Sequence, residues 1–166
     1  RLTPGLGIHL RGLADEVLVN DFPGATIQRH EREMLATAVS AANDCFFCMD
    51  SHGAFATELL GRAGRTDEVP VIDIIKTGDT AALEPRMQAL VRIARIVGRD
   101  PLALTAADTQ AARDAGASDG DVQLAVLIAA GFSMYNRMVD GFRAMTPPVV
   151  EAHHESALRI AEHGYS

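Results

Sequence analysis

Residues 31–52 read E-R-E-M-L-A-T-A-V-S-A-A-N-D-C-F-F-C-M-D-S-H, and the interpretation of the whole chain starts from this stretch. It contains the only two cysteines, Cys45 and Cys48, as a C-x-x-C pair. His52 follows four residues after the second cysteine, and Glu33 precedes the first cysteine by twelve. A dithiol, an imidazole and a carboxylate would make a proton-relay redox site if the fold brings them together.

The pattern around the cysteines predicts two helices joined by a short turn. Thr26 is suited to cap a helix that runs to about Ala42, with an apolar stripe along one face. Asn43-Asp44 then interrupts the pattern, and either residue is suited to be the N-cap of the next helix. That helix is expected to open at Cys45 and to end near residues 61–64, where glycines occur.

Helical periodicity continues through the rest of the chain. It predicts helices over about 6–19, 85–98, 105–116, 119–142 and 149–163, and it favours a helix over 69–76, where a strand is the alternative. The helix at 119–142 is the longest and most apolar, which suits the centre of the fold or an oligomer interface. Six to eight helices with short loops and no convincing strand predict an all-α protein. We expect one domain over residues 1–166, with a core over about 6–142 and a C-terminal helix over about 149–163.

Composition and charge narrow the class of protein further. The 166 residues are 48% hydrophobic but only 5% aromatic, which suits a core of close-packed aliphatic helices. The net charge of -7 argues against nucleic acid or an anionic membrane as a partner, since both need a basic surface. Arg1–Val19 lacks the apolar region of a signal peptide, and the most apolar run, Leu124–Phe132, is too short for a membrane span. We therefore expect a cytoplasmic protein.

The chemistry of the cysteine pair depends on where its helix begins. If the helix opens near Cys45, both thiols lie in its first turn, close enough to form a disulfide. The positive end of the helix dipole there favours a thiolate, whereas the charge of Asp44 opposes it if that side chain points inward. His52 lies one helical turn beyond Cys48 on the same face, where an imidazole can accept the thiol proton.

Glu33 is the best candidate for a carboxylate that orients His52, as in a catalytic triad. Two antiparallel helices joined at Asn43-Asp44 bring positions at similar distances from the turn to the same level. Glu33 lies about ten residues before the turn and His52 about eight after it. Glu31, two residues earlier and on a different face of the helix, is the fallback.

Two other interpretations of the cysteines remain open. A single C-x-x-C can be half of a zinc site, with His52 as a third ligand, although no second pair exists and no other histidine has a supporting spacing. The two cysteines can also be buried residues without a chemical role. The adjacent pair His153-His154 would point to different sides of a helix, and we expect it on the surface.

Two segments together resemble a known family. Glu33, Cys45-x-x-Cys48 and His52, with the Asn-Asp before the first cysteine, resemble the alkylhydroperoxidase-D-like (AhpD-like) family within the carboxymuconolactone decarboxylase superfamily. The later segment 132–141, F-S-M-Y-N-R-M-V-D-G, is similar to the pattern F-x-x-x-N-R-x-x-D in the family's peroxidase-related branch. The likeness covers roughly residues 2–142.

The resemblance implies an AhpD-like helical fold in a homo-oligomer, a trimer or hexamer, with dimers also seen. It implies reduction of alkyl hydroperoxides without metal, haem or flavin. Cys48 would be the peroxidatic cysteine, Cys45 the resolving cysteine, His52 the base and Glu33 its orienting partner. A thioredoxin-like or lipoyl-type dithiol would restore both thiols. A general thiol–disulfide oxidoreductase of the same fold is the alternative activity.

Phe47 departs from the family pattern. The family's best-known members have a histidine directly before the second cysteine, where this chain has Phe47. The substitution removes one possible relay member, and a phenyl ring would shield Cys48 from water, which tends to raise a thiol pKa. We therefore expect weaker peroxidase activity, or activity directed at an apolar hydroperoxide. The dithiol argues against muconolactone decarboxylation, which does not depend on such a pair.

Overall fold

The computed structural model describes residues 4–145, 147 and 150–166, and over these residues it contains helices and loops without a strand. This confirms the all-α prediction. The α-helices are α1 Pro4–Leu18, α2 Arg29–Ala42, α3 Phe46–Arg62, α4 Pro70–Thr77, α5 Pro85–Arg99, α6 Ala106–Asp114, α7 Asp119–Gly141 and α8 His154–His163. Short 3-10 segments cover Thr66–Glu68, Pro101–Ala103 and Val150–His153. The expected helix start at residue 149 lies outside the described residues.

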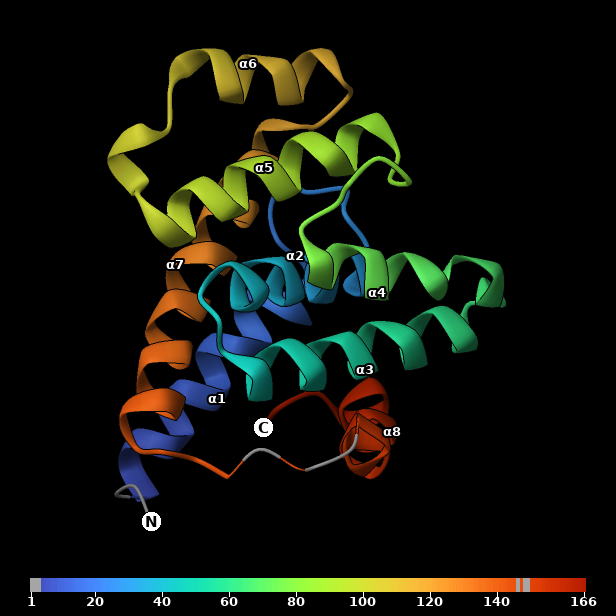
Figure 1. The fold of residues 1–166 in the computed structure, drawn as a ribbon, viewed down its shortest axis with the longest axis vertical. Helices are drawn as coiled ribbons and strands as arrows, with labels where there is room; N and C mark the ends of the chain where they lie inside the picture. The colour runs from blue at the N-terminus through green and yellow to red at the C-terminus, as the bar shows by residue number, and fades with distance from the viewer. Residues whose placement is uncertain (1–3, 146, 148–149) are drawn as a thin grey trace.

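The helix α2 lies in the interior and packs against α3, α4, α5 and α7. In Figure 1, α5 and α6 lie to one side of α2, whereas α3 and α8 lie to the other. All residues from His30 to Ser40 are buried, so even the charged side chains of this helix face protein. A carboxylate on α2 is therefore shielded from water, and its orientation depends on the few groups that contact it.

The core is aliphatic, as the composition predicts. Its fully buried large apolar side chains come from α1 to α5, from α7 and from the segment before α2: Leu18, Ile27, Leu35, Val39, Leu60, Ile75, Leu90, Ile93, Leu124, Ile128 and Phe132. One aromatic ring, that of Phe132, is among them. This ring packs edge-on against His52 of α3, with ring centroids 4.5 Å apart, so the core extends to the cysteine-bearing helix.

The carboxylate of Asp121 ties the start of α7 to the segment before α2. It accepts hydrogen bonds from the backbone N–H groups of Thr26, at 2.6 Å, and Ile27, at 2.9 Å. These contacts hold Thr26 in the loop before α2, so our expectation that Thr26 caps α2 is wrong. The helix starts at Arg29 instead, and the Glu31 carboxylate accepts a hydrogen bond from Gln28 N at 2.7 Å.

Close contact between backbones also joins the start of α7 to the segment before α2. Gly120, in the first turn of α7, lies against the backbone of Gly24 and Ala25, and a Cβ atom at position 120 would overlap both. Glycine is the residue that permits such an approach. The hydroxyl of Ser118, the N-cap of α7, also donates to Gly24 O at 2.7 Å.

The helix α7 is long and apolar enough to cross a membrane by length and composition alone, with a mean hydropathy of 1.3 over 18 residues. We expected no segment of this kind from the run Leu124–Phe132. The core helix of a globular protein passes the same test, and α7 packs against α1, α2 and α5. The observation is therefore weak evidence for a membrane span.

Candidate active site

The two cysteines lie at the start of α3. Cys45 is the N-cap residue and Cys48 is in the first turn, so the helix begins slightly later than an N-cap at Asn43 or Asp44 would require. Asn43 instead ends α2 as its C-cap, and Asp44 adopts a left-handed φ of 57°. The side chain of Asp44 is 80% exposed and lies 3.8 Å from Arg99. Its charge therefore points to solvent rather than toward the thiols.

Cys45 and Cys48 are free thiols in contrasting surroundings. Cys45 is fully buried, and its sulfur lies 4.0 Å from the backbone oxygen of Asn136. Cys48 is 4% exposed and lines a pocket. Cys48 is thus the thiol of the pair that a small molecule in the pocket meets first.

The environment also separates the acidities of the two thiols. A hydrogen bond from Cys45 lowers the pKa of Cys48 from 9.0 to about 7, with further help from nearby His52 and the side chain of Asn136. The same hydrogen bond, together with burial, raises the pKa of Cys45. Burial does act to raise the pKa of Cys48, as we expected for a thiol beside Phe47, but the hydrogen bond from Cys45 outweighs this effect.

Glu33 and His52 meet between α2 and α3. The Glu33 Oε2 atom lies 2.7 Å from His52 Nδ1, and the Glu33 side chain is fully buried. The structure therefore brings together the four residues singled out in the sequence, while their chemical roles stay predictions. The fallback residue, Glu31, points elsewhere: its carboxylate lies 2.5 Å from Arg86 Nη2.

Tyr165 is a site residue that the sequence did not reveal. Its hydroxyl donates to Glu33 Oε1 at 2.8 Å and lies 3.3 Å from His52 Nδ1. Its ring stacks on His52, with centroids 6.1 Å apart and planes inclined by 25°. Tyr165 follows α8 and is far from both partners in sequence, so no local pattern marks it.

Asn136 of α7 is a second residue whose place was missed. Its side-chain oxygen accepts from Asn43 Nδ2 at 2.9 Å, and its side-chain nitrogen donates to Ser40 Oγ at 3.0 Å. Because its backbone oxygen is near Cys45 and its side chain lowers the pKa of Cys48, Asn136 contacts both thiols. The motif at 132–141 drew attention to this segment but assigned no role to it.

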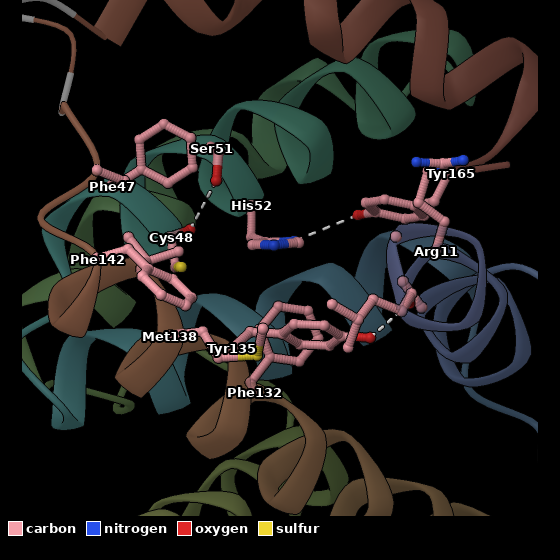
Figure 2. A pocket seen from close by; sticks show the side chains of 15 residues that line it. Arg11, Phe47, Cys48, Ser51, His52, Phe132, Tyr135, Met138, Phe142 and Tyr165 are labelled. Atoms are coloured by element: carbon pink, nitrogen blue, oxygen red, sulfur yellow. Dashed lines mark hydrogen bonds between the residues drawn. The ribbon is translucent and has the colours of Figure 1, made fainter. Parts of the chain in front are cut away.

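The pocket in front of Cys48 has a volume of about 810 Å³. Figure 2 shows Cys48 and His52 on one wall and the rings of Phe132 and Tyr135 opposite them. Most of the residues that line it are apolar. The complete lining is Gly7, Leu10, Arg11, Ala14, Phe47, Cys48, Ser51, His52, Phe132, Tyr135, Met138, Val139, Phe142, Ala144 and Tyr165. The Cys48 thiol, whose pKa is lowered, therefore faces a mostly apolar pocket.

The remaining histidines do not gather around the cysteines as metal ligands. In the described part of the chain, no group of three or more His, Cys, Asp or Glu side chains is placed to hold a metal ion. His153, expected on the surface, is 5% exposed and packs edge-on against Phe47 with ring centroids 5.5 Å apart. Burial lowers its pKa. Its neighbour His154 is exposed, so the surface prediction is wrong for one residue of the pair.

A known protein family matches the part of the chain that contains the candidate site. The sequence profile of the carboxymuconolactone decarboxylase family matches residues 14–95, a span that includes Glu33, both cysteines and His52. No curated protein matches the chain.

Solved structures share the fold over most of the chain. An uncharacterized peroxidase-related protein from Silicibacter sp. TM1040 superposes with a TM-score of 0.73 at 22% identity, covering 89% of this chain and 71% of that one. An AhpD-core protein from Ralstonia eutropha JMP134, also described as peroxidase-related, gives 0.72 at 26% identity, with coverages of 91% and 74%. A protein of unknown function from Agrobacterium tumefaciens, described as a putative antioxidant defence protein AhpD, gives 0.69 at 17% identity, with coverages of 89% and 94%. Residues 14–95 thus match the carboxymuconolactone decarboxylase family, and the chain has the AhpD-like fold of these neighbours.

Proposed function

We propose that the protein is a thiol peroxidase that reduces alkyl hydroperoxides through the Cys45–Cys48 pair. The observation that carries this proposal is the difference between the two thiols. Cys48 lines the pocket with a pKa of about 7, while Cys45 behind it is fully buried and stays protonated. A thiolate with a protonated partner within hydrogen-bond reach is the arrangement that peroxide reduction by a dithiol needs. The peroxidase-related neighbours support an antioxidant role.

The reaction would proceed in two steps, the formation of a sulfenic acid and the formation of a disulfide. The Cys48 thiolate attacks the distal oxygen of the hydroperoxide, the O–O bond breaks, and Cys48 becomes a sulfenic acid while the alkoxide takes a proton and leaves as an alcohol. The Cys45 sulfur then attacks the sulfenic sulfur, the S–O bond breaks, and a disulfide and water form. The two thiols together supply the two electrons that the peroxide accepts.

His52 and Glu33 would manage the protons of this cycle. His52 takes the proton of Cys48 before the attack and can return it to the leaving alkoxide. Glu33, at 2.7 Å from the imidazole, orients the ring and stabilises its charged form. The same imidazole is among the groups that lower the pKa of Cys48.

The burial of Cys45 determines which sulfur of the disulfide an external reductant would attack. An external dithiol of the thioredoxin-like or lipoyl type reaches the site through the pocket, so it attacks the Cys48 sulfur and Cys45 is the leaving group. The second thiol of the reductant then attacks the reductant's own sulfur in the mixed disulfide, which releases the oxidised reductant and restores the Cys48 thiol.

The pocket lining indicates the class of peroxide. Side chains from α3 and α7, including Phe47, Phe132, Met138 and Val139, surround the approach to Cys48 with carbon. Burying an alkyl or aryl group there is favourable by about 25 cal/mol for each Å² removed from water. Organic hydroperoxides should therefore bind better than hydrogen peroxide.

The proposal is tested with the reduced protein and a panel of peroxides under anaerobic conditions. We expect one equivalent of cumene hydroperoxide to remove both thiols, with a dithiol restoring them. The half-saturating concentration should be lower than for hydrogen peroxide. Metal analysis of the same sample addresses the zinc interpretation, and one tightly held zinc per chain would overturn the proposal. Rapid exchange with disulfides without consumption of any peroxide would favour the general oxidoreductase instead.

A further inference from the structure

Glu33 has two carboxylate oxygens, and each has its own partner. Oε2 lies 2.7 Å from His52 Nδ1, and Oε1 accepts the Tyr165 hydroxyl at 2.8 Å. The third side of this triangle, from Tyr165 Oη to His52 Nδ1, is longer at 3.3 Å. Figure 2 shows the Tyr165 hydroxyl directed toward His52, on the opposite side of the imidazole from Cys48.

Counting hydrogen-bond donors and acceptors assigns the tautomer of a neutral His52. A tyrosine hydroxyl has one proton, and donation to Glu33 Oε1 leaves none for His52 Nδ1. With Oε1 occupied, an ionised Glu33 offers Oε2 as the acceptor for His52 Nδ1–H. The proton of a neutral His52 is then on Nδ1, and Nε2 is the nitrogen left to accept a proton from Cys48. Burial and the charge of Glu33 raise the pKa of Tyr165, so its hydroxyl remains a donor at neutral pH.

The segment that carries Tyr165 is tethered at several points. The backbone N–H of Tyr165 donates to Asp15 Oδ1 of α1 at 2.7 Å, and the Ser166 hydroxyl bonds to Oδ2 of the same carboxylate. The Arg29 guanidinium of α2 donates to Ile160 O at 3.0 Å and to Ala161 O at 3.1 Å, at the end of α8. Two helices of the core therefore fix where the tyrosine ring enters the site.

We propose that Tyr165 is a positioning residue of the relay, which holds the Glu33 carboxylate turned so that His52 keeps its Nε2 atom free for Cys48. This inference rests on the proposed function, because a defined tautomer matters when His52 acts as the base. It adds a third relay member from the end of the described chain to the two that the sequence indicated.

The test compares Tyr165→Phe with Tyr135→Phe. Both remove one hydroxyl from a pocket-lining ring, but the Tyr135 hydroxyl donates to the backbone oxygen of Leu10, at 2.6 Å, and not to the relay. The first readout is the ¹⁵N NMR spectrum of His52 in the reduced protein. We expect the Nδ1–H tautomer in the wild type and in Tyr135→Phe, and a mixture with Nε2–H in Tyr165→Phe.

The second readout is the rate of Cys48 oxidation by cumene hydroperoxide. For Tyr165→Phe we expect a fall of roughly 10-fold in the maximal rate with an unchanged half-saturating concentration, because the base and not the substrate contact is affected. Asp15→Ala keeps the hydroxyl but removes the tether, and it should change the tautomer ratio in the same direction. An unaltered tautomer in Tyr165→Phe, or the same change in both tyrosine variants, would overturn the inference.

The two readouts also separate this inference from the proposed function. A wild-type protein that consumes no peroxide would refute the peroxidase proposal. The tautomer comparison is made without peroxide and would still decide whether Tyr165 positions His52.

Discussion

Cys45 hydrogen-bonds to Cys48 from a position that solvent does not reach, whereas Cys48 lines the pocket. This relationship predicts different outcomes for the two serine variants. Cys48→Ser should consume no peroxide, because the remaining thiol is buried and protonated. Cys45→Ser should consume one equivalent and stop, with a sulfenic acid on Cys48 that a dimedone probe traps and mass spectrometry locates. If Cys45→Ser is the variant without a peroxide-reactive thiol, the assigned roles are reversed.

The pKa of Cys48 predicts the pH profile of thiol reactivity. A thiol with a pKa of about 7 is roughly 1% ionised at pH 5, half ionised at pH 7 and fully ionised above pH 9. Alkylation by iodoacetamide should therefore speed up about 50-fold between pH 5 and pH 7 and level off above pH 8. Because the pKa of Cys45 is raised, a single titration is expected in this range. A midpoint near 9 would contradict the acidity of Cys48.

Glu33→Gln should slow the oxidation of Cys48 by one to two orders of magnitude, less than the roughly two to four orders that a general base itself contributes. The amide cannot stabilise a charged imidazole, and it leaves one buried partner unpaired at a cost of about 1–3 kcal/mol in the free energy of unfolding. Stopped-flow oxidation and denaturant unfolding measure the two effects. Glu31→Gln is the matched control, since Glu31 pairs with Arg86 and should leave the oxidation rate unchanged. Equal rates in the two variants would remove Glu33 from the relay.

Asn136→Ala should raise the pKa of Cys48, because the amide is among the groups that lower it. It also leaves Asn43 and Ser40 without their buried partner, so the free energy of unfolding should fall by about 1–3 kcal/mol. The alkylation midpoint and a urea titration give the two values. Ser133→Ala, which removes a longer 3.4 Å contact with Asn43 from the same helix, should change both values less. A midpoint that does not move would mean that Asn136 supports the fold alone.

Gly120→Ala tests the junction between α7 and the segment before α2. The added methyl group overlaps the backbone of Gly24 and Ala25, which cannot move aside as a flexible side chain would. Overpacking of this kind costs about 1–3 kcal/mol. Gly61→Ala is the control, because its new Cβ meets open space within α3 and should stabilise the helix by about 0.5–1 kcal/mol. Thermal unfolding should therefore give shifts of opposite sign.

The parts of the site that the sequence predicts are those set by local geometry. Glu33 and His52 lie on consecutive antiparallel helices, so their distances from the intervening turn are enough to place them side by side. The predicted helix starts near residues 105 and 119 are likewise found, because the capping hydrogen bonds of Thr105 and Ser118 lie within four residues. The roles of the pair as base and orienting group still need the variants described above.

The parts that the sequence did not reveal depend on contacts between distant segments. Thr26 has the chemistry of an N-cap, but hydrogen bonds to Asp121, 95 residues away, hold it outside the helix. His153 has the polarity of a surface residue, but the ring of Phe47 covers it. Tyr165 reaches Glu33 across 132 residues, and a single sequence contains no signal for such a pair.

The order in which the site residues are synthesised follows from the position of Tyr165. A ribosome that has made the cysteine pair and His52 has yet to make Asn136, whose side chain lowers the pKa of Cys48, and Tyr165, which contacts Glu33 and His52. The nascent chain therefore carries its two thiols through 88 residues of elongation after Cys48 before Asn136 is made, and through 117 before Tyr165 is made. A thiol with an ordinary pKa is mostly protonated at neutral pH and reacts slowly with peroxide. The set of groups that lower the pKa of Cys48 is therefore complete only after Asn136 has been made.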